Sequence, residues 1–184
     1  MRVLAGSGIG LVEVTLDTPG ALEEIERAAA RGITVGAGTV VRAEQVRACA
    51  EAGARFVVSP GCLPDVMGEA HAFGLAAIPG ALSTTEILTA MALNAQAVKL
   101  FPASIGGPAY LRTLRGPFPA TRFVPTGGVE LEDVPVYLEA GAACVGLGTS
   151  LVGRTPPASP DELRAIEERA RRAVALAGSA PDPR

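Results

Sequence analysis

The 184-residue chain has no tryptophan, a single histidine (His71) and a single lysine (Lys99), and aromatic residues make up only 4% of it. One histidine argues against a metal site built from several histidines. The three cysteines are odd in number and widely spaced, which fits neither a disulfide framework nor a zinc site. These shortages favour buried, inert thiols over a disulfide framework or a zinc site.

Long apolar runs are also scarce, and neither sign of charge strongly predominates. The formal net charge is −3, and no basic run interleaved with aromatics is present, so neither nucleic acid nor an anionic membrane is an expected partner. No stretch approaches the length of a membrane span, and the N-terminus lacks a basic region followed by an apolar block, so a cytoplasmic location is expected. The length and the 48% apolar content favour one domain over residues 1–184.

The chain does contain a repeat. Short apolar runs rich in strand-forming residues start 21 to 25 residues apart, which leaves room for one strand, one helix and two short loops. The seven runs cover residues 11–16, 33–40, 55–61, 76–81, 97–103, 122–128 and 143–151. Almost entirely apolar strands that alternate with helices predict a parallel sheet covered by helices.

The even spacing favours an α/β fold of the closed (β/α)₈ TIM-barrel type over an open sheet. Only seven strands are countable, because residues 1–10 have the pattern of a helix end and a turn. We therefore expect the first βα unit of the barrel to be lacking. The predicted barrel core covers residues 10–153, a charged C-terminal helix covers about 159–176, and a frayed tail covers 178–184.

Lys99 is the strongest candidate for covalent chemistry. Fifteen arginines supply the remaining basic charge, and arginine cannot act as an amine nucleophile. In an extended strand, Lys99 and Phe101 share one face while Val98 and Leu100 share the other. If the second face meets the helices, Lys99 points into the barrel. The alternative is a structural lysine paired with a buried carboxylate.

Glu13 is the candidate proton carrier. It lies at the centre of the run Leu-Val-Glu-Val-Thr-Leu, on the strand face opposite Val12 and Val14. A lone carboxylate on an inner face is costly unless it is paired or functional. It could shuttle protons during bond cleavage, and it could also form a structural ion pair with Lys99. The two interpretations are compatible.

Two further strand ends offer weaker signals. Thr39 ends the run Gly-Ala-Gly-Thr, in which Gly36 and Gly38 permit close backbone approach. Its hydroxyl could bind a substrate carboxylate, or it could bond to nearby backbone. Pro60 would place an apolar ring at another strand end, although by itself it indicates only a turn.

Glycine pairs end the last two strands. Gly127 and Gly128 follow Thr126, and Gly146 and Gly148 lie in the final run. Barrels of this type commonly bind phosphate at these two positions, using backbone N–H groups rather than a basic cluster. The pattern therefore favours a phosphorylated ligand.

These residues lie in blocks that resemble the KDPG/KHG aldolases, which act on 2-keto-3-deoxy-6-phosphogluconate or 4-hydroxy-2-oxoglutarate. The resemblance covers roughly residues 10–153. The matching blocks, in order, are VEVTL, VGAGTV, FVVSPG, AIPGALSTTEI, VKLFPAS, GPF and RFVPTGGV. It implies a metal-independent lyase without a cofactor, whose partners are a 2-keto acid and a phosphorylated aldehyde, and which assembles as a homotrimer.

The resemblance also implies a role for each candidate residue. Lys99 would form the Schiff base and Glu13 would be the general acid and base. Thr39 would bind the carboxylate region of pyruvate, while Pro60 and Phe101 would wall the pocket.

The remaining implied contacts concern the far end of the substrate. Thr126 would touch the substrate and influence stereoselectivity. Four residues would hold the phosphate: Gly127, Gly128, Gly148 and Thr149.

One departure and two alternatives complete the sequence-based hypothesis. Many relatives carry arginine four residues after the glutamate, where this chain has Asp17, which would repel a carboxylate. A phosphosugar isomerase or epimerase barrel would use strand-end carboxylates without a nucleophilic lysine. A truncated, inactive barrel fragment would be weakly stable or held together by its exposed strand edges.

Overall fold

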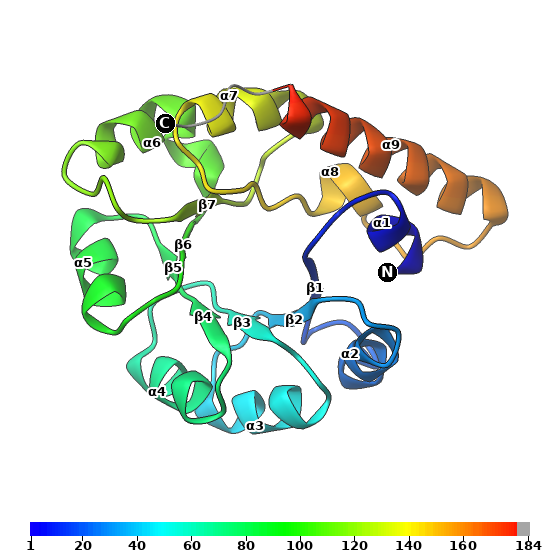
Figure 1. The fold of residues 1–184 in the computed structure, drawn as a ribbon, viewed down its shortest axis with the longest axis horizontal. Helices are drawn as coiled ribbons and strands as arrows, with labels where there is room; N and C mark the ends of the chain where they lie inside the picture. Colours follow the sequence, from blue (N-terminus) through cyan, green and yellow to red (C-terminus); the bar gives the residue numbers. More distant parts are fainter. Residues whose placement is uncertain (180–184) are drawn as a thin grey trace. The chain divides into compact units, whose positions relative to one another are not determined.

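The structure is a computed structural model and describes residues 1–179. Its elements are, in chain order, α1 (Arg2–Gly6), β1 (Val12–Thr15), α2 (Ala21–Ala29), β2 (Val35–Gly38), α3 (Ala43–Glu51), β3 (Phe56–Val58), α4 (Pro64–Ala72), β4 (Ala76–Ile78), β5 (Gly80–Ala81), α5 (Thr84–Ala92), β6 (Val98–Leu100), η1 (Ala103–Ile105), α6 (Gly107–Arg115), β7 (Phe123–Pro125), η2 (Leu131–Asp133), α7 (Val134–Glu139), α8 (Thr149–Val152) and α9 (Pro160–Gly178). Strands and helices alternate through most of this order, as the repeat predicts (Figure 1).

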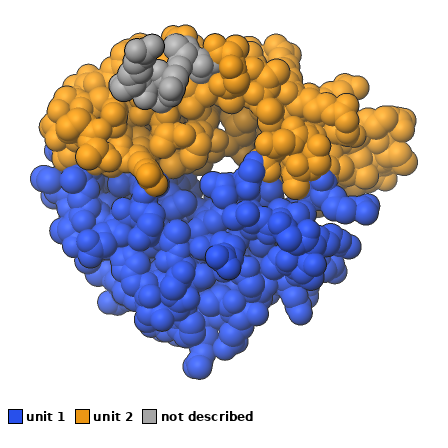
Figure 2. Space-filling model, viewed as in Figure 1, with its two compact units in different colours: residues 1–2, 10–99 blue, residues 3–9, 100–184 orange. Residues whose placement is uncertain are grey.

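The chain divides into two compact units, coloured separately in Figure 2. Unit 1 comprises residues 1–2 and 10–99, and unit 2 comprises residues 3–9 and the chain from Leu100 onward. The expectation of one domain over residues 1–184 stays a prediction.

Unit 1 contains a parallel four-stranded sheet in the order β1-β2-β3-β4. Figure 1 shows α2, α3 and α4 along one side of these strands. The apolar residues between sheet and helices form a core of small side chains, among them Ile25, Val35, Val46 and Met67, each at most 1% exposed. A core of this kind is what a chain poor in aromatics must build.

The two faces of β1 differ as its alternation predicts. Val12 and Val14 are 6% and 8% exposed and face the helices, whereas Glu13 lies on the opposite face and remains accessible. In the parallel register, Glu13 is opposite Gly36, and Thr15 is opposite Gly38. The helix-facing apolar residues therefore fix which way the carboxylate points.

The single strand expected over residues 76–81 is two short strands, β4 and β5, separated by Pro79. Proline has no N–H to give to a strand ladder, which explains the interruption. A second sheet has the order β5-β6-β7, and the boundary between the units falls within β6. On the unit 1 side, the Lys99 N–H donates to the Pro79 carbonyl at 2.9 Å.

Unit 2 contains α1 and the C-terminal helices. The helix end and turn expected at residues 1–10 are confirmed by α1, and Leu4 and Ile9 pack against a cluster that includes Ala170 and Ala173 of α9. The charged helix expected over 159–176 is also confirmed. Its Ser159 side chain accepts from the Glu162 N–H, and α9 continues to Gly178, within the stretch expected to fray. The rest of that predicted tail, 180–184, lies outside the described residues.

The prediction of a strand over residues 143–151 was wrong, because no regular strand forms there. Only a single parallel bridge forms there, between Thr126 and Gly146, and Thr149–Val152 is helix α8. Gly146 and Gly148 interrupt this run, and glycine weakens strand interiors because it has no side chain to pack.

Among the described residues, no helix is long and apolar enough to cross a bilayer.

A local prediction concerns the start of α5. The Ser83 side chain accepts from the Glu86 N–H, and the Glu86 carboxylate accepts from the Ser83 N–H in return. Because this capping box satisfies two N–H groups that the helix leaves unpaired, Ser83→Ala should lower the free energy of unfolding by about 1 kcal/mol. Urea denaturation would measure it, and an unchanged midpoint would contradict the capping role.

Candidate active site

Lys99 lies at the centre of β6 and is only 8% exposed. Its neighbours Val98 and Leu100 are each 1% exposed. Burial of a lysine is unusual, since long charged side chains are almost never enclosed unless they are paired or functional. The one amine side chain in the sequence is therefore enclosed within the protein.

Glu13 lies within electrostatic range of this lysine. Burial raises the pKa of the Glu13 carboxyl above its ordinary value, and the positive charge of Lys99 opposes that shift without cancelling it. Solvent still reaches part of the Glu13 side chain. A carboxylate that is partly stripped of water yet accessible is suited to proton transfer with a bound molecule.

Gly38 makes room for this carboxylate. A Cβ atom added at Gly38 would lie 1.8 Å from Glu13 Oε1 and 2.6 Å from its Cδ. The sequence suggested that Gly36 and Gly38 allow close approach of backbone, but at Gly38 the approaching group is the Glu13 side chain. At Gly36 it is the ring of Phe56, 2.3 Å from an added Cβ.

Thr39 follows directly and has a left-handed backbone, with φ 57°. This conformation is a genuine outlier for a β-branched residue and costs on the order of 1–3 kcal/mol. Within residues 1–179, its accessible hydroxyl makes no hydrogen bond, so the alternative of a bond to nearby backbone finds no support. Strain and an available hydroxyl together favour a ligand-binding role.

Pro60 is accessible on the loop after β3, and its backbone packs against β5. A Cβ atom at Gly80 would lie 2.2 Å from the Pro60 carbonyl oxygen. Gly80 is a residue that the sequence-based list of candidates omitted. Its signal was a glycine within a strand run, which often marks such an approach.

In unit 2, four predicted site residues come together. A Cβ at Gly127 would lie 2.8 Å from the Phe101 ring. Gly127 and Gly128 both have left-handed backbone, with φ 90° and 70°. Thr126 donates its hydroxyl to the Val124 carbonyl at 3.1 Å, so that hydroxyl is already engaged inside the protein.

Gly148 and Thr149 lie at the start of α8, shortly after the bridge between Gly146 and Thr126. The candidate residues are thus divided between the units. Unit 1 holds Glu13, Thr39, Pro60 and Lys99, and unit 2 holds Phe101, Thr126, Gly127, Gly128, Gly148 and Thr149.

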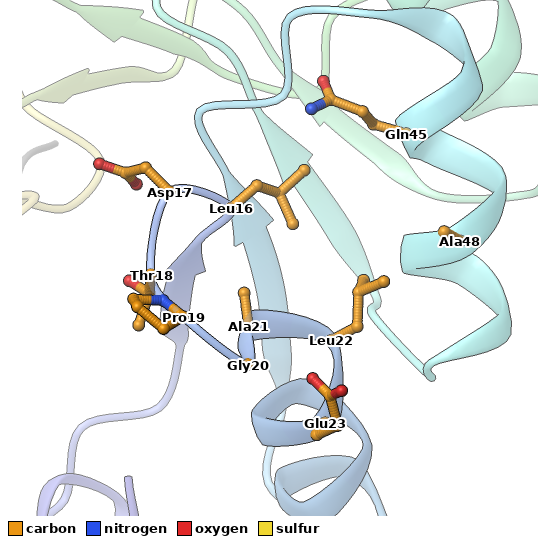
Figure 3. A pocket seen from close by; sticks show the side chains of 10 residues that line it. All are labelled: Leu16, Asp17, Thr18, Pro19, Gly20, Ala21, Leu22, Glu23, Gln45 and Ala48. Carbon is orange, nitrogen blue, oxygen red and sulfur yellow. The ribbon is translucent and has the colours of Figure 1, made fainter.

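A surface hollow in unit 1 is lined by none of these groups. The β1–α2 loop, the first turn of α2 and helix α3 line it (Figure 3). Leu16 and Leu22 point into the space beside α3, whereas Asp17 points away from that helix. The lining carries Asp17 and Glu23 but no basic residue, which does not suit a carboxylate or a phosphate. The hollow is therefore not our candidate active site.

Metal ligands do not gather in the described part of the chain. Among residues 1–179, no cluster of three or more His, Cys, Asp or Glu side chains is positioned to hold an ion.

Comparison with known proteins identifies the family. A family model described as KDPG and KHG aldolase matches residues 1–167. The 2-dehydro-3-deoxy-phosphogluconate aldolase of Treponema pallidum (strain Nichols) is 42% identical over 140 residues, which is 74% of this chain and 67% of that protein. The 2-dehydro-3-deoxy-6-phosphogalactonate aldolase of Escherichia coli K12 is 36% identical over 149 residues, 79% of this chain and 73% of that protein.

A solved structure adds a comparison of the fold. The KDPG aldolase of Legionella pneumophila, captured with pyruvate as a covalent carbinolamine, superposes with a TM-score of 0.77 and 29% identity, covering 98% of this chain and 85% of that one. Such likeness confirms the α/β-barrel class of the fold. With sequence blocks, family model and structural likeness in agreement, this chain belongs to the KDPG/KHG aldolase family of lyases.

Proposed function

We propose that this protein cleaves 2-keto-3-deoxy-6-phosphogluconate to pyruvate and glyceraldehyde 3-phosphate through a Schiff base on Lys99. The observation that carries the proposal is the sole lysine, enclosed in β6 within electrostatic range of the Glu13 carboxyl. An amine nucleophile and a carboxylate of raised pKa are the two groups that such an aldol cleavage requires.

The reaction would run in balanced steps. The neutral Lys99 amine attacks the C2 ketone, water leaves, and a protonated imine forms. Glu13, directly or through water, accepts the proton of the C4 hydroxyl, the C3–C4 bond breaks, and its electron pair moves to the imine. The aldehyde departs and an enamine remains. Protonation of the enamine carbon and hydrolysis by water then release pyruvate and restore the Lys99 amine.

Binding would be shared among the other candidates. Thr39, with its available hydroxyl, would bind the carboxylate of the keto acid, and Pro60 and Phe101 would wall the pocket. Thr126 would contact the substrate near C4 and influence stereoselectivity. The phosphate would be held by backbone N–H groups at Gly127, Gly128, Gly148 and Thr149. Gly127 and Gly128 lie in a bend with left-handed φ, and backbone N–H groups in turns can bind anions.

Several finer points belong to the same proposal. The substrate could also include 4-hydroxy-2-oxoglutarate, and the configuration at C4 could be that of the galactonate series, since relatives bear both names. A cytoplasmic location and a homotrimeric assembly are proposed from the family resemblance. Asp17, in place of the arginine of many relatives, should weaken carboxylate binding.

The direct test is borohydride reduction in the presence of pyruvate, followed by intact mass measurement and peptide mapping. Only Lys99 and the N-terminal amine can be labelled, so the result is unambiguous. We expect a reduced pyruvyl adduct on the peptide that contains Lys99, and none when pyruvate is left out. A folded sample without the adduct would reject the Schiff-base proposal and favour the isomerase or inactive-fragment alternatives.

A further inference from the structure

The position of the Glu13 carboxylate depends on the absence of a Cβ atom at Gly38 of β2. Glu13 is opposite Gly36 in the strand register, but its side chain extends along the strand and lies over Gly38, two residues further on. A Cβ at Gly38 would be 1.8 Å from Oε1, 2.6 Å from Cδ and 2.8 Å from Cγ. Every side chain except that of glycine would overlap the carboxylate where it now lies.

The backbone itself does not demand glycine at this position. Gly38 is absent from the residues with left-handed φ, in contrast to Gly127 or Gly128, and it belongs to a regular parallel strand. An alanine there would adopt the same conformation without strain. The requirement for glycine therefore comes from the Glu13 side chain, whose atoms are the three nearest to the added Cβ, and not from the backbone conformation.

We infer that Gly38 is a positioning residue for the proposed acid–base chemistry: by lacking a Cβ, it holds open the space that Glu13 occupies over β2. The inference rests on the proposed function of Glu13. It assigns a role to the second glycine of Val-Gly-Ala-Gly that neither strand formation nor backbone conformation explains.

Gly36 provides the contrast within the same strand. A Cβ at Gly36 would meet the Phe56 ring at 2.3–2.5 Å, and that ring is only 7% exposed. A buried ring has little room to move, so Gly36→Ala should act mainly on stability. The end of the Glu13 side chain can rotate away, so Gly38→Ala should spare the fold and displace the carboxylate.

The charged surroundings of Glu13 are simple. β2 carries no titratable side chain, α2 with its charged residues lies on the far face of the sheet, and Lys99 of β6 is the charge that acts on the carboxyl. Because burial is what raises the pKa of Glu13, a carboxylate pushed toward water should titrate at lower pH. The acid limb of the pH–rate profile should move with it.

The experiment compares Gly38→Ala with native protein and with Gly68→Ala, a control in α4 where an added Cβ meets nothing within 4 Å. We expect Gly38→Ala to lower kcat by about 10- to 100-fold, because a displacement of about 1 Å can cost that much. The acid limb of its kcat profile should shift to lower pH, pyruvate should still be trapped on Lys99, and Gly68→Ala should retain native kcat.

A double-mutant cycle keeps the test decisive even if Gly38→Ala unfolds more easily. In a Glu13→Ala background the overlapping atoms are gone, so Gly38→Ala should then leave the unfolding midpoint unchanged. An equal loss of stability in both backgrounds would overturn the inference, as would native kcat and pH profile in Gly38→Ala. Failure to trap pyruvate on native protein would instead overturn the proposed function and this inference with it.

Discussion

Replacing Lys99 by arginine is expected to lower kcat for aldol cleavage by about 10⁴-fold or more, a loss of over about 5 kcal/mol of transition-state stabilisation. Arginine preserves the positive charge beside Glu13 but cannot form an imine. Steady-state assay of pyruvate release would measure the loss. Borohydride trapping should fail on the same variant.

Lys99→Met is the matched variant without charge, of similar length. Both substitutions should give folded protein by circular dichroism and abolish turnover alike, since the amine itself is required. Activity of Lys99→Arg within about tenfold of native would assign Lys99 to a structural ion pair with Glu13 and support an isomerase-like barrel.

Glu13→Gln is expected to lower kcat by about 10²- to 10⁴-fold, the usual contribution of a positioned acid or base. Gln cannot accept the C4 hydroxyl proton, whereas Lys99 is unchanged, so pyruvate should still be trapped by borohydride. Native protein should lose activity as pH falls through the raised pKa of Glu13, which lies above the ordinary value of about 4.3. In Glu13→Gln this acid limb should disappear from the residual rate.

The same substitution should stabilise the protein near neutral pH. A carboxyl whose pKa is raised by burial holds its proton in the native state at pH values where the unfolded chain has lost it. Native stability therefore falls as pH rises from the unfolded pKa through the folded pKa, and this loss persists above it. Gln has no such loss, so denaturation midpoints of the variant and native protein should differ more at pH 7 than at pH 4.

Two outcomes would contradict this account of Glu13. A Glu13→Gln variant with native kcat would remove the carboxylate from the proton-transfer steps. A variant that is less stable than native protein at pH 7 would indicate that the attraction between Glu13 and Lys99 outweighs the cost of burying the carboxyl.

The sequence by itself determined the alternation of strands and helices, because apolar runs and helix signals recur at nearly constant spacing. It also determined which way Glu13 points. Val12 and Val14 must be buried against helices, and the two-residue period of a strand then leaves Glu13 on the other face. The uniqueness of Lys99 is likewise a property of the sequence alone.

The tertiary structure decided what local patterns could not encode. The glycine-rich run at 143–151 had enough apolar residues to be expected as a strand, but only one bridge formed there and the chain entered α8. Pro79 divided an expected strand in two. Strand pairing depends on partners far along the chain. Whether a segment of weak strand propensity forms a strand is therefore decided by its packing against those partners rather than by its own residues.

The details of the candidate site belong to the same category. That Gly38 leaves room for Glu13 follows from the parallel register of β1 and β2, which brings together residues 25 positions apart. The left-handed φ of Thr39 is equally invisible in the sequence, and the glycine at position 80 signals a close approach without identifying Pro60 as the partner. The sequence specifies which groups are present and which face they take. Only the register of neighbouring strands fixes the distances between them, because those contacts join segments that have no local relation.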